Sequence, residues 1–191
     1  MKVSETALPG VLLFEPTVFQ DDRGFFLETW NSARYRDAGV AADFVQANQA
    51  RSRRGVLRGL HFQLGRPQAK LIWVTRGEIF DVAVDIRRGS PDFGRWVGAT
   101  LTGENHTQLF VPAGFAHGYY VVSESVDVSY LCSDLYWPAG DRGVRWDDPA
   151  IGIDWPPGEK LLSAKDRALP LLADATELPL HEPLPRGEKA G

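Results

Sequence analysis

The sequence predicts a mainly β protein, built as a sandwich or barrel with a few short helices. The 191 residues include 19 Gly and 13 Pro, which favours many turns and short strands over long helices. Between residues 69 and 134, apolar runs of strand length follow one another at short spacing, separated by turn sequences. Closely spaced short strands of this kind are typical of antiparallel sandwiches and barrels.

The few predicted helices are short and lie outside the dense strand region. One covers residues 33–38, with Asn31 or Ser32 as its N-cap and Gly39 as its end. After residue 134 Gly and Pro predict an irregular wrap, and Ser163 can start another helix. About the last 15 residues form a weakly specified tail. Strands are predicted at residues 11–14, 25–30, 44–48, 56–62, 69–75, 78–86, 95–101, 108–111, 118–122 and 126–134.

The length and composition predict one domain. With 43% hydrophobic residues the chain can bury a sizeable core, and no repeat or linker divides it. We expect a single domain over residues 1–191. Its N-terminal strands and helix reach about residue 55, its strand-rich core covers about 56–135, and its wrap and tail cover about 136–191.

Charge and cysteine content limit the function classes. The net charge of −4 argues against general nucleic-acid binding. The single cysteine, Cys132, excludes an intramolecular disulfide and fits a reducing cytoplasm. The N-terminus carries no apolar signal region, and no apolar run approaches the roughly 20 residues of a membrane-spanning helix. We therefore expect a cytoplasmic protein.

The most informative stretch places a cation and an imidazole, Arg58 and His61, three residues apart in apolar sequence. Strict alternation puts them on opposite faces of a strand, but a glycine between them, Gly59, often marks a bulge that would bring both to one side. A histidine and cations beside a buried strand suggest chemistry on an anionic small molecule. The alternative is that His61 is a structural histidine.

Three further polar residues fall on strand faces with apolar neighbours. Tyr130 shares a face with Val126 and Val128, which indicates either a core tyrosine bonded to backbone or a functional phenol. Lys70 is either a solvated strand-end charge or a cation that points into a cavity. Asp81 lies on a face that is either the interior of a barrel or simply solvent-exposed.

The segment from Pro112 to His117 resembles the second sequence motif of the cupins, P-x-G-x-x-H. Cupins are small jelly-roll β-barrels, and many bind a metal through this histidine. Their first motif supplies two histidines as H-x-H, whereas His61 is followed by Phe62 and Gln63. We therefore expect a metal-free barrel whose chemistry comes from acid–base groups.

Eight ordered blocks resemble the dTDP-4-dehydrorhamnose 3,5-epimerase family, a group of cupin-type deoxysugar epimerases. The resemblance extends from about residue 10 to about residue 170. The blocks are residues 22–28, 46–48, 55–63, Lys70, 77–87, 112–118, 142–149 and 163–166.

This resemblance implies a dTDP-linked 4-keto-6-deoxyhexose as substrate, epimerised at C3 and C5 without a redox cofactor or metal. It assigns His61 as the base, Asp166 as the group that orients its imidazole, Tyr130 as the acid, and Lys70 as the cation beside the carbonyl. It also implies a homodimer whose N-terminal residues reach into the partner's site. The implied substrate-binding residues are Arg23, Glu28, Gln46, Asn48, Arg58, His117, Asp141 and Lys165.

Some assignments have simpler alternatives. Asp166 follows Ser163 by three residues and could merely complete a helix cap, and Lys165 could be a surface charge. Arg142 and Arg145 could pair with Asp147 or Asp148. The chain has Leu135-Tyr136 where members often carry an aromatic pair, and Asp141 where they often have Glu, which leaves fine substrate preference open.

Three other functions stay open. A relative that acts at C3 only or at C5 only would share the histidine, lysine and tyrosine. A non-catalytic sugar-nucleotide-binding cupin would have no need to retain all four catalytic side chains. A metal-dependent cupin isomerase or dioxygenase would lose its activity in excess chelator.

Overall fold

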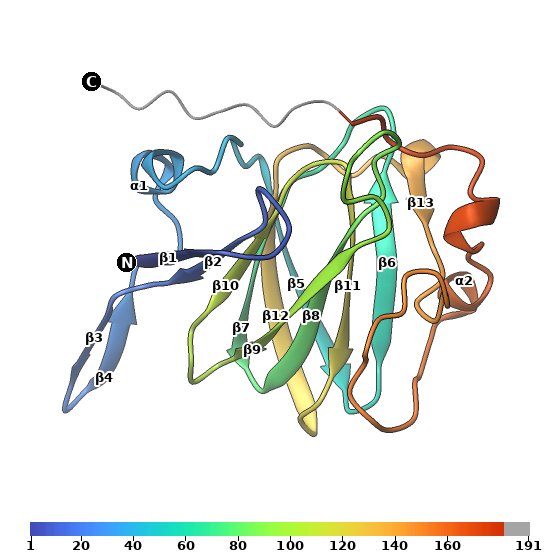
Figure 1. Ribbon diagram of the computed structural model, residues 1–191. Helices are drawn as coiled ribbons and strands as arrows, with labels where there is room; N and C mark the ends of the chain where they lie inside the picture. The colour runs from blue at the N-terminus through green and yellow to red at the C-terminus, as the bar shows by residue number, and fades with distance from the viewer. Residues whose placement is uncertain (182–191) are drawn as a thin grey trace.

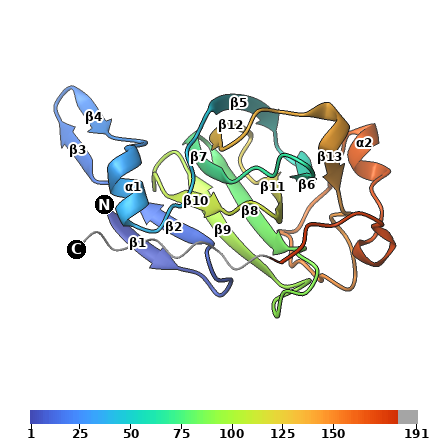
Figure 2. The ribbon, with the colours of Figure 1, turned by 90° about the horizontal axis from the view of Figure 1, so that it is seen from above.

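The computed structural model describes residues 1–181, and it consists of two antiparallel sheets packed face to face (Figures 1 and 2). The mainly β, jelly-roll prediction is therefore confirmed. The larger sheet has the order β1 (Lys2–Glu5), β2 (Leu12–Glu15), β10 (Gln108–Val111), β7 (Lys70–Arg76), β12 (Ser125–Cys132) and β5 (Gln46–Arg53). The smaller has the order β13 (Asp141–Gly143), β6 (Leu57–Gln63), β11 (Phe115–Val121), β8 (Glu78–Asp85) and β9 (Trp96–Thr102).

The remaining elements are a hairpin and four short helices. The hairpin of β3 (Val18–Asp21) and β4 (Gly24–Leu27) projects from the body at the lower left of Figure 1. Both predicted helices are confirmed with their caps. Asn31 accepts from the Arg34 amide at the start of α1 (Ser32–Asp37), and Ser163 from the Asp166 amide at the start of α2 (Ala164–Arg167). Two 3-10 turns are η1 (Pro138–Gly140) and η2 (Leu172–Asp174).

The sequence located most strands but missed some edges. Strand β10 has its predicted bounds, whereas β11 begins at Phe115, three residues early, and β5 runs on to Arg53. The short strands β1, β3 and β13 were not predicted. Because β1, β2 and β5 belong to the larger sheet, strands from before residue 56 also take part in the layered core. Most of the predicted tail, residues 182–191, lies outside the described residues.

Apolar side chains fill three layers. The inner layer lies between the sheets and includes Ile72, Ile79 and Val128, each inaccessible to solvent. A second layer lies on the outer face of the smaller sheet, where the C-terminal wrap covers it, and a third lies between the larger sheet and α1. Each fully buried aliphatic side chain stabilises the fold by about 1.5–3 kcal/mol. Among the described residues, no helix is long and apolar enough to cross a bilayer.

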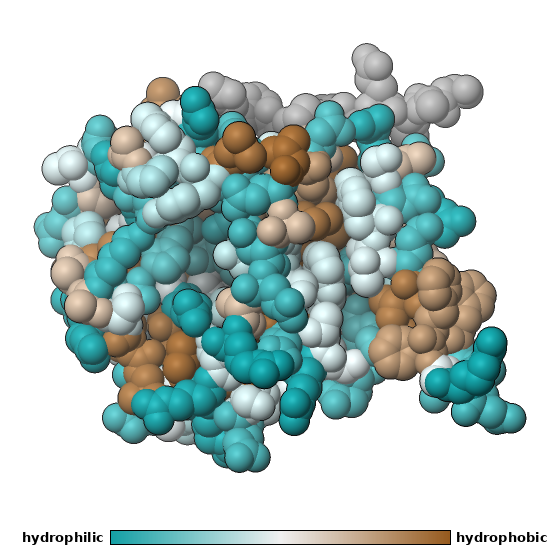
Figure 3. Space-filling model, turned by 180° about the vertical axis from the view of Figure 1, so that it is seen from behind, coloured by the Kyte–Doolittle hydropathy of each residue, from teal (hydrophilic) through white to brown (hydrophobic). Residues whose placement is uncertain are grey.

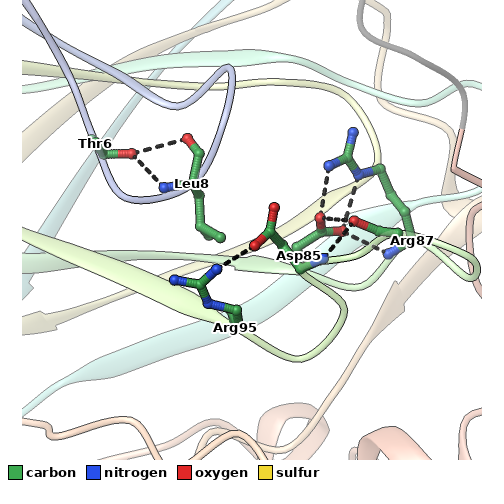
Figure 4. Close-up of polar contacts among 7 residues, drawn as sticks. Thr6, Leu8, Asp85, Arg87 and Arg95 are labelled. Carbon is green, nitrogen blue, oxygen red and sulfur yellow. Dashed lines mark hydrogen bonds and ion pairs between the residues drawn. The ribbon is translucent and has the colours of Figure 1, made fainter.

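A buried ion pair fixes the end of β8. Two guanidinium nitrogens of Arg87 donate to the Asp85 carboxylate at 3.0 and 2.7 Å, and the Ser90 hydroxyl adds a bond of 2.6 Å (Figure 4). The guanidinium also lies 4.4 Å from the centre of the Phe115 ring. Asp81 and Asp85 are both 0% exposed, so the face of β8 that carries them is interior rather than solvent-exposed.

A close approach of two glycines breaks the alternation of β6. Gly59 has a φ of +122°, and the register with β11 shifts between the pairs His117–His61 and Tyr119–Arg58. A Cβ on Gly118 would lie 2.7 Å from the Arg58 carbonyl oxygen, and one on Gly59 only 2.6 Å from the Gly118 Cα. The bulge expected at Gly59 is thus confirmed.

We predict that Gly118→Ala lowers the free energy of unfolding by about 1–3 kcal/mol, because its methyl group would overlap backbone atoms that cannot rotate away. Urea denaturation followed by circular dichroism measures the change. Gln49→Ala, on the exposed side of β5, serves as the control and should leave the midpoint nearly unchanged. An equal midpoint for Gly118→Ala and the wild type would contradict the proposed tight approach.

Candidate active site

One cavity of about 480 Å³ opens between the two sheets and gathers side chains from both. The smaller sheet supplies residues from β6 and β11, the larger sheet supplies residues from β7 and β12, and α2 closes one side. Seven of the predicted site residues line it: Arg58, His61, Lys70, His117, Tyr130, Lys165 and Asp166.

His61 and Asp166 form a hydrogen-bonded dyad at the cavity wall. The His61 Nε2 lies 2.6 Å from the Asp166 Oδ1, and the two side chains are 31% and 5% exposed. Burial acts to raise the pKa of Asp166, but hydrogen bonds from His61 and Ser163 outweigh it and leave this pKa below its ordinary value. An ionised Asp166 fixes Nε2 as the protonated nitrogen, so Nδ1 is left as the basic atom.

Asp166 makes both of the contacts that were considered for it. Its backbone amide donates to the Ser163 hydroxyl at 3.0 Å, which completes the helix cap, while its carboxylate holds His61. The short helix α2 places this carboxylate beside β6, although 105 residues separate the two partners in the sequence.

Lys70 and Tyr130 lie on the opposite sheet. Tyr130 pairs in register with Ile72, and Cys132 pairs with Lys70, so the Lys70 and Tyr130 side chains share the inner face of neighbouring strands. Burial raises the pKa of Tyr130, with Cys132 acting in the same direction and Arg58 against it. The phenol is thus a protonated acid at neutral pH. Burial lowers the pKa of Lys70.

A second histidine–aspartate pair lies next to the first. His117 and His61 are register partners on β11 and β6, and the His117 Nε2 lies 2.7 Å from the Asp81 Oδ1. Asp81 did not figure among the predicted site residues, although alternation along β8 had placed it on a possible interior face.

Sequence reasoning also missed Tyr119, Arg53 and the segment from Leu161 to Ser163, all of which line the cavity. Tyr119 is only 5% exposed, and burial raises its pKa while Arg58 and the Ser52 hydroxyl act in the opposite direction. Alternation along β11 would have placed Tyr119 on the same face as His117, and that signal could have found it.

Three predicted residues, Asp141, Gln46 and Asn48, lie at the rim of the cavity, next to the residues that line it. The Asp141 carboxylate accepts from the Lys165 ammonium and, at 3.0 Å, from the Tyr136 hydroxyl. Burial acts to raise the pKa of Asp141, but the hydrogen bonds from Lys165 and Tyr136 outweigh it and leave this pKa lowered overall. On β5, Gln46 donates to Asn48 at 3.1 Å and accepts from the Tyr136 amide at 2.8 Å.

Arg23 and Glu28 lie away from the cavity of their own chain. Arg23 is at the tip of the hairpin, where it pairs with Asp21 at 2.6 Å, and its side chain is 89% exposed. Glu28 pairs with Arg34 at 3.1 Å beside α1. The hairpin and α2 lie at opposite sides of the molecule in Figures 1 and 2.

The two arginines of the C-terminal wrap have structural partners. Arg145 pairs with Asp147 at 2.9 Å, as one alternative predicted, whereas Arg142 pairs with Glu177 at 3.0 Å. Over residues 1–181, no three side chains of His, Cys, Asp or Glu come together as possible metal ligands.

Comparisons with known proteins agree with this geometry. The family model described as dTDP-4-dehydrorhamnose 3,5-epimerase matches residues 5–174. A dTDP-4-dehydrorhamnose 3,5-epimerase of Pseudomonas aeruginosa is 51% identical over 181 residues, which cover 94% of this chain and 100% of the relative.

Solved structures are similar over nearly the whole chain. RmlC of Legionella pneumophila, a dTDP-6-deoxy-D-glucose-3,5-epimerase in complex with dTDP-4-keto-L-rhamnose, has a TM-score of 0.92 and 45% identity, covering 95% of this chain and 98% of that one. ChmJ, a 3'-monoepimerase of Streptomyces bikiniensis in complex with dTDP-quinovose, has a TM-score of 0.86 and 36% identity, covering 92% and 91%. The chain belongs to the dTDP-4-dehydrorhamnose 3,5-epimerase family of isomerases.

Proposed function

We propose that this chain epimerises dTDP-4-dehydro-6-deoxy-D-glucose at C3 and C5, giving dTDP-4-dehydro-L-rhamnose. The observation that carries the proposal is one cavity with the His61–Asp166 dyad, formed by β6 and α2, on one side and Lys70 and Tyr130 of the larger sheet on the other. The family model and the P. aeruginosa relative support the same reaction.

The first step is removal of a proton next to a ketone. The C4 carbonyl of the substrate acidifies the protons on C3 and C5, and the Nδ1 atom of His61 accepts one of them. Asp166 stabilises the imidazolium that forms, because its ionised carboxylate already accepts from Nε2. Negative charge develops on the C4 oxygen, and the Lys70 ammonium stabilises it electrostatically.

The second step returns a proton from the opposite side. His61 belongs to the smaller sheet and Tyr130 to the larger, so the two reach a sugar in the cavity from facing walls. Tyr130 donates its phenolic proton to the carbon, and the enolate collapses to the ketone with inverted configuration. His61 has then gained one proton and Tyr130 has lost one, and exchange with solvent restores both.

The nucleotide diphosphate requires cations outside the reacting centre. Arg58 lines the cavity, and its Nε donates to the Ser52 hydroxyl at 3.1 Å, which fixes the guanidinium without neutralising it. A fixed guanidinium suits paired contacts with phosphate oxygens. Lys165 lies at the rim, and Gln46, Asn48, His117 and Asp141 complete the proposed substrate contacts.

A second copy of the chain completes the site in this proposal. Arg23 and Glu28 cannot act in the cavity of their own chain as placed, because the hairpin extends away from it. The hairpin exposes Phe19, Phe25 and Phe26 to 63%, 60% and 70%, and Figure 3 shows a hydrophobic patch on the projecting arm. Large exposed apolar surfaces mark interaction sites. We infer a cytoplasmic homodimer in which the hairpin of one protomer brings Arg23 to its partner's cavity.

A reaction at only one carbon is the second candidate. It is favoured by the likeness to ChmJ, which is a 3'-monoepimerase. The base, the acid and the lysine would be the same in both reactions, so the two are separated by where exchange occurs.

We predict that the enzyme incorporates deuterium from D2O at both C3 and C5 of the 4-keto sugar, because both carbons flank the ketone. Mass spectrometry and proton NMR of the sugar measure the exchange. In His61→Ala the rate should fall by about 10²–10⁴-fold, the usual contribution of a general base. Binding of dTDP by calorimetry should persist.

Exchange at a single carbon would replace the double epimerase with a monoepimerase. Unchanged exchange in His61→Ala would show that another group is the base. Adding excess chelator to the same reaction should leave the wild-type rate intact, and a loss would favour the metal-dependent alternative.

We also predict that two inactive variants restore activity when their subunits are mixed. In a heterodimer of Arg23→Ala and His61→Ala, the cavity with intact His61 receives the intact Arg23 of its partner. Random mixing should restore about a quarter of wild-type sites, since half of the dimers are mixed and each has one complete site. The readout is exchange activity after co-refolding. An absence of recovery would mean that Arg23 acts within its own chain, and full activity of Arg23→Ala alone would mean that Arg23 has no role.

A further inference from the structure

A buried carboxylate behind the cavity has no role in the reaction described so far. Asp81 on β8 is 0% exposed. Its Oδ1 lies 2.7 Å from the His117 Nε2, but its Oδ2 is buried and has no hydrogen bond among residues 1–181. A buried carboxylate oxygen without a partner is costly, because it loses its hydration and receives nothing in return. A positive charge nearby would offset this cost.

Lys70 is the cation that could pair with the Asp81 charge. It lines the cavity as a cation that makes no hydrogen bond or ion pair among residues 1–181, and burial lowers its pKa. Three groups act against burial and favour its charged form: Cys132 first, then Asp81 and Asp141. Burial raises the pKa of Cys132, so this thiol is uncharged at neutral pH and the two carboxylates supply the negative charge.

The two carboxylates differ in what else they bind. Asp141 lies at the rim, where it already accepts hydrogen bonds from Lys165 and Tyr136. Asp81 is fully enclosed, and within the described part of the chain one of its carboxylate oxygens has no hydrogen-bond partner. A charge in the interior acts more strongly on its neighbours than one near solvent, because the effective dielectric constant is lower. Asp81 is therefore the better candidate to hold Lys70 in its charged form.

The fold explains why Asp81 can act on both walls. Asp81 pairs in register with Tyr119 on β11. Tyr119 is two residues after His117, which pairs with His61, so it lies on the same face of the sheet as His117. Asp81 therefore lies on the inner face of the smaller sheet, behind His117, while Lys70 faces it from the larger sheet.

We propose that Asp81 is a positioning residue of this enzyme, which orients His117 with one carboxylate oxygen and keeps the Lys70 side chain an ammonium ion with its charge. The use of that ammonium ion on the C4 oxygen rests on the proposed function, whereas the effect on Lys70 in the substrate-free protein does not. The titratable groups around the pair are His117 and Tyr119 from β11, Tyr130 and Cys132 from β12, Asp141 from β13 and Arg58 from β6.

The test is the titration of Lys70 in the substrate-free protein, followed by carbon NMR of lysine Cε and assigned by the signal that Lys70→Gln removes. In Asp81→Asn the amide can still accept from His117, but the negative charge is gone. Loss of that charge favours the neutral amine, so Lys70 should titrate about one pH unit lower than in the wild type. The alkaline limb of the exchange rate should move in the same direction.

Two variants separate charge from structure. Asp127→Asn removes a negative charge from β12, where Asp127 pairs with Arg51 at 2.6 Å, and should leave the Lys70 titration in place. Asp81→Glu keeps the negative charge, so Lys70 in this variant should titrate close to its wild-type position. This second variant also serves as a measurement if Asp81→Asn folds poorly. An unchanged Lys70 titration in folded Asp81→Asn overturns the proposal, as does an equal shift in Asp127→Asn. Failure of the proposed function would appear separately, as absent exchange in the wild type.

Discussion

The active cavity depends on the contact between Gly59 and Gly118. Regular alternation along β6 would direct Arg58 and His61 to opposite faces of the sheet, so one of them would be lost to the cavity. The register shift at this contact lets both line it. Only residues without a Cβ allow the two backbones this close, because the added atom would lie 2.6–2.7 Å from main-chain atoms. The position of the proposed base thus follows from a packing constraint between two strands.

The two-sheet architecture also places the proposed base, His61, and the proposed acid, Tyr130, on opposite walls of the cavity. The smaller sheet carries the histidines, each hydrogen-bonded to a carboxylate: Asp166 at the cavity wall for His61, and Asp81 behind the cavity for His117. The larger sheet carries Lys70 and Tyr130 with no carboxylate of its own facing them. Burial therefore favours the neutral form of both side chains, which suits Tyr130 and opposes Lys70. It keeps the phenol protonated, as an acid requires, but it opposes the charge that an oxyanion-stabilising lysine needs.

Local sequence signals predicted most of the strands and helices, but they located only some of the residues of the candidate site. Period-two alternation placed Lys70 and Tyr130 on strand faces with apolar neighbours and left open whether these faces meet a cavity, which both residues line in the structure. Ser163 correctly marked the start of α2. The same signals could not pair His61 with Asp166, since 105 residues separate them and no short-range pattern connects them. That pairing came from the family resemblance. Strand β13 was missed because three residues within a Gly- and Pro-rich segment carry too little periodicity to indicate a strand.

The two cations Arg58 and Lys165 differ in whether another residue already matches their charge. Arg58 is held by a neutral hydroxyl, so its charge is available to a diphosphate, whereas the Lys165 charge is already matched by Asp141. The Asp141 carboxylate reaches both Lys165 and Tyr136. Tyr136 in turn is fixed by Gln46 through its amide, and Leu135 next to it is 53% exposed. The Asp141 carboxylate therefore connects Tyr136 to Lys165, and Lys165 precedes Asp166 of the dyad directly on α2.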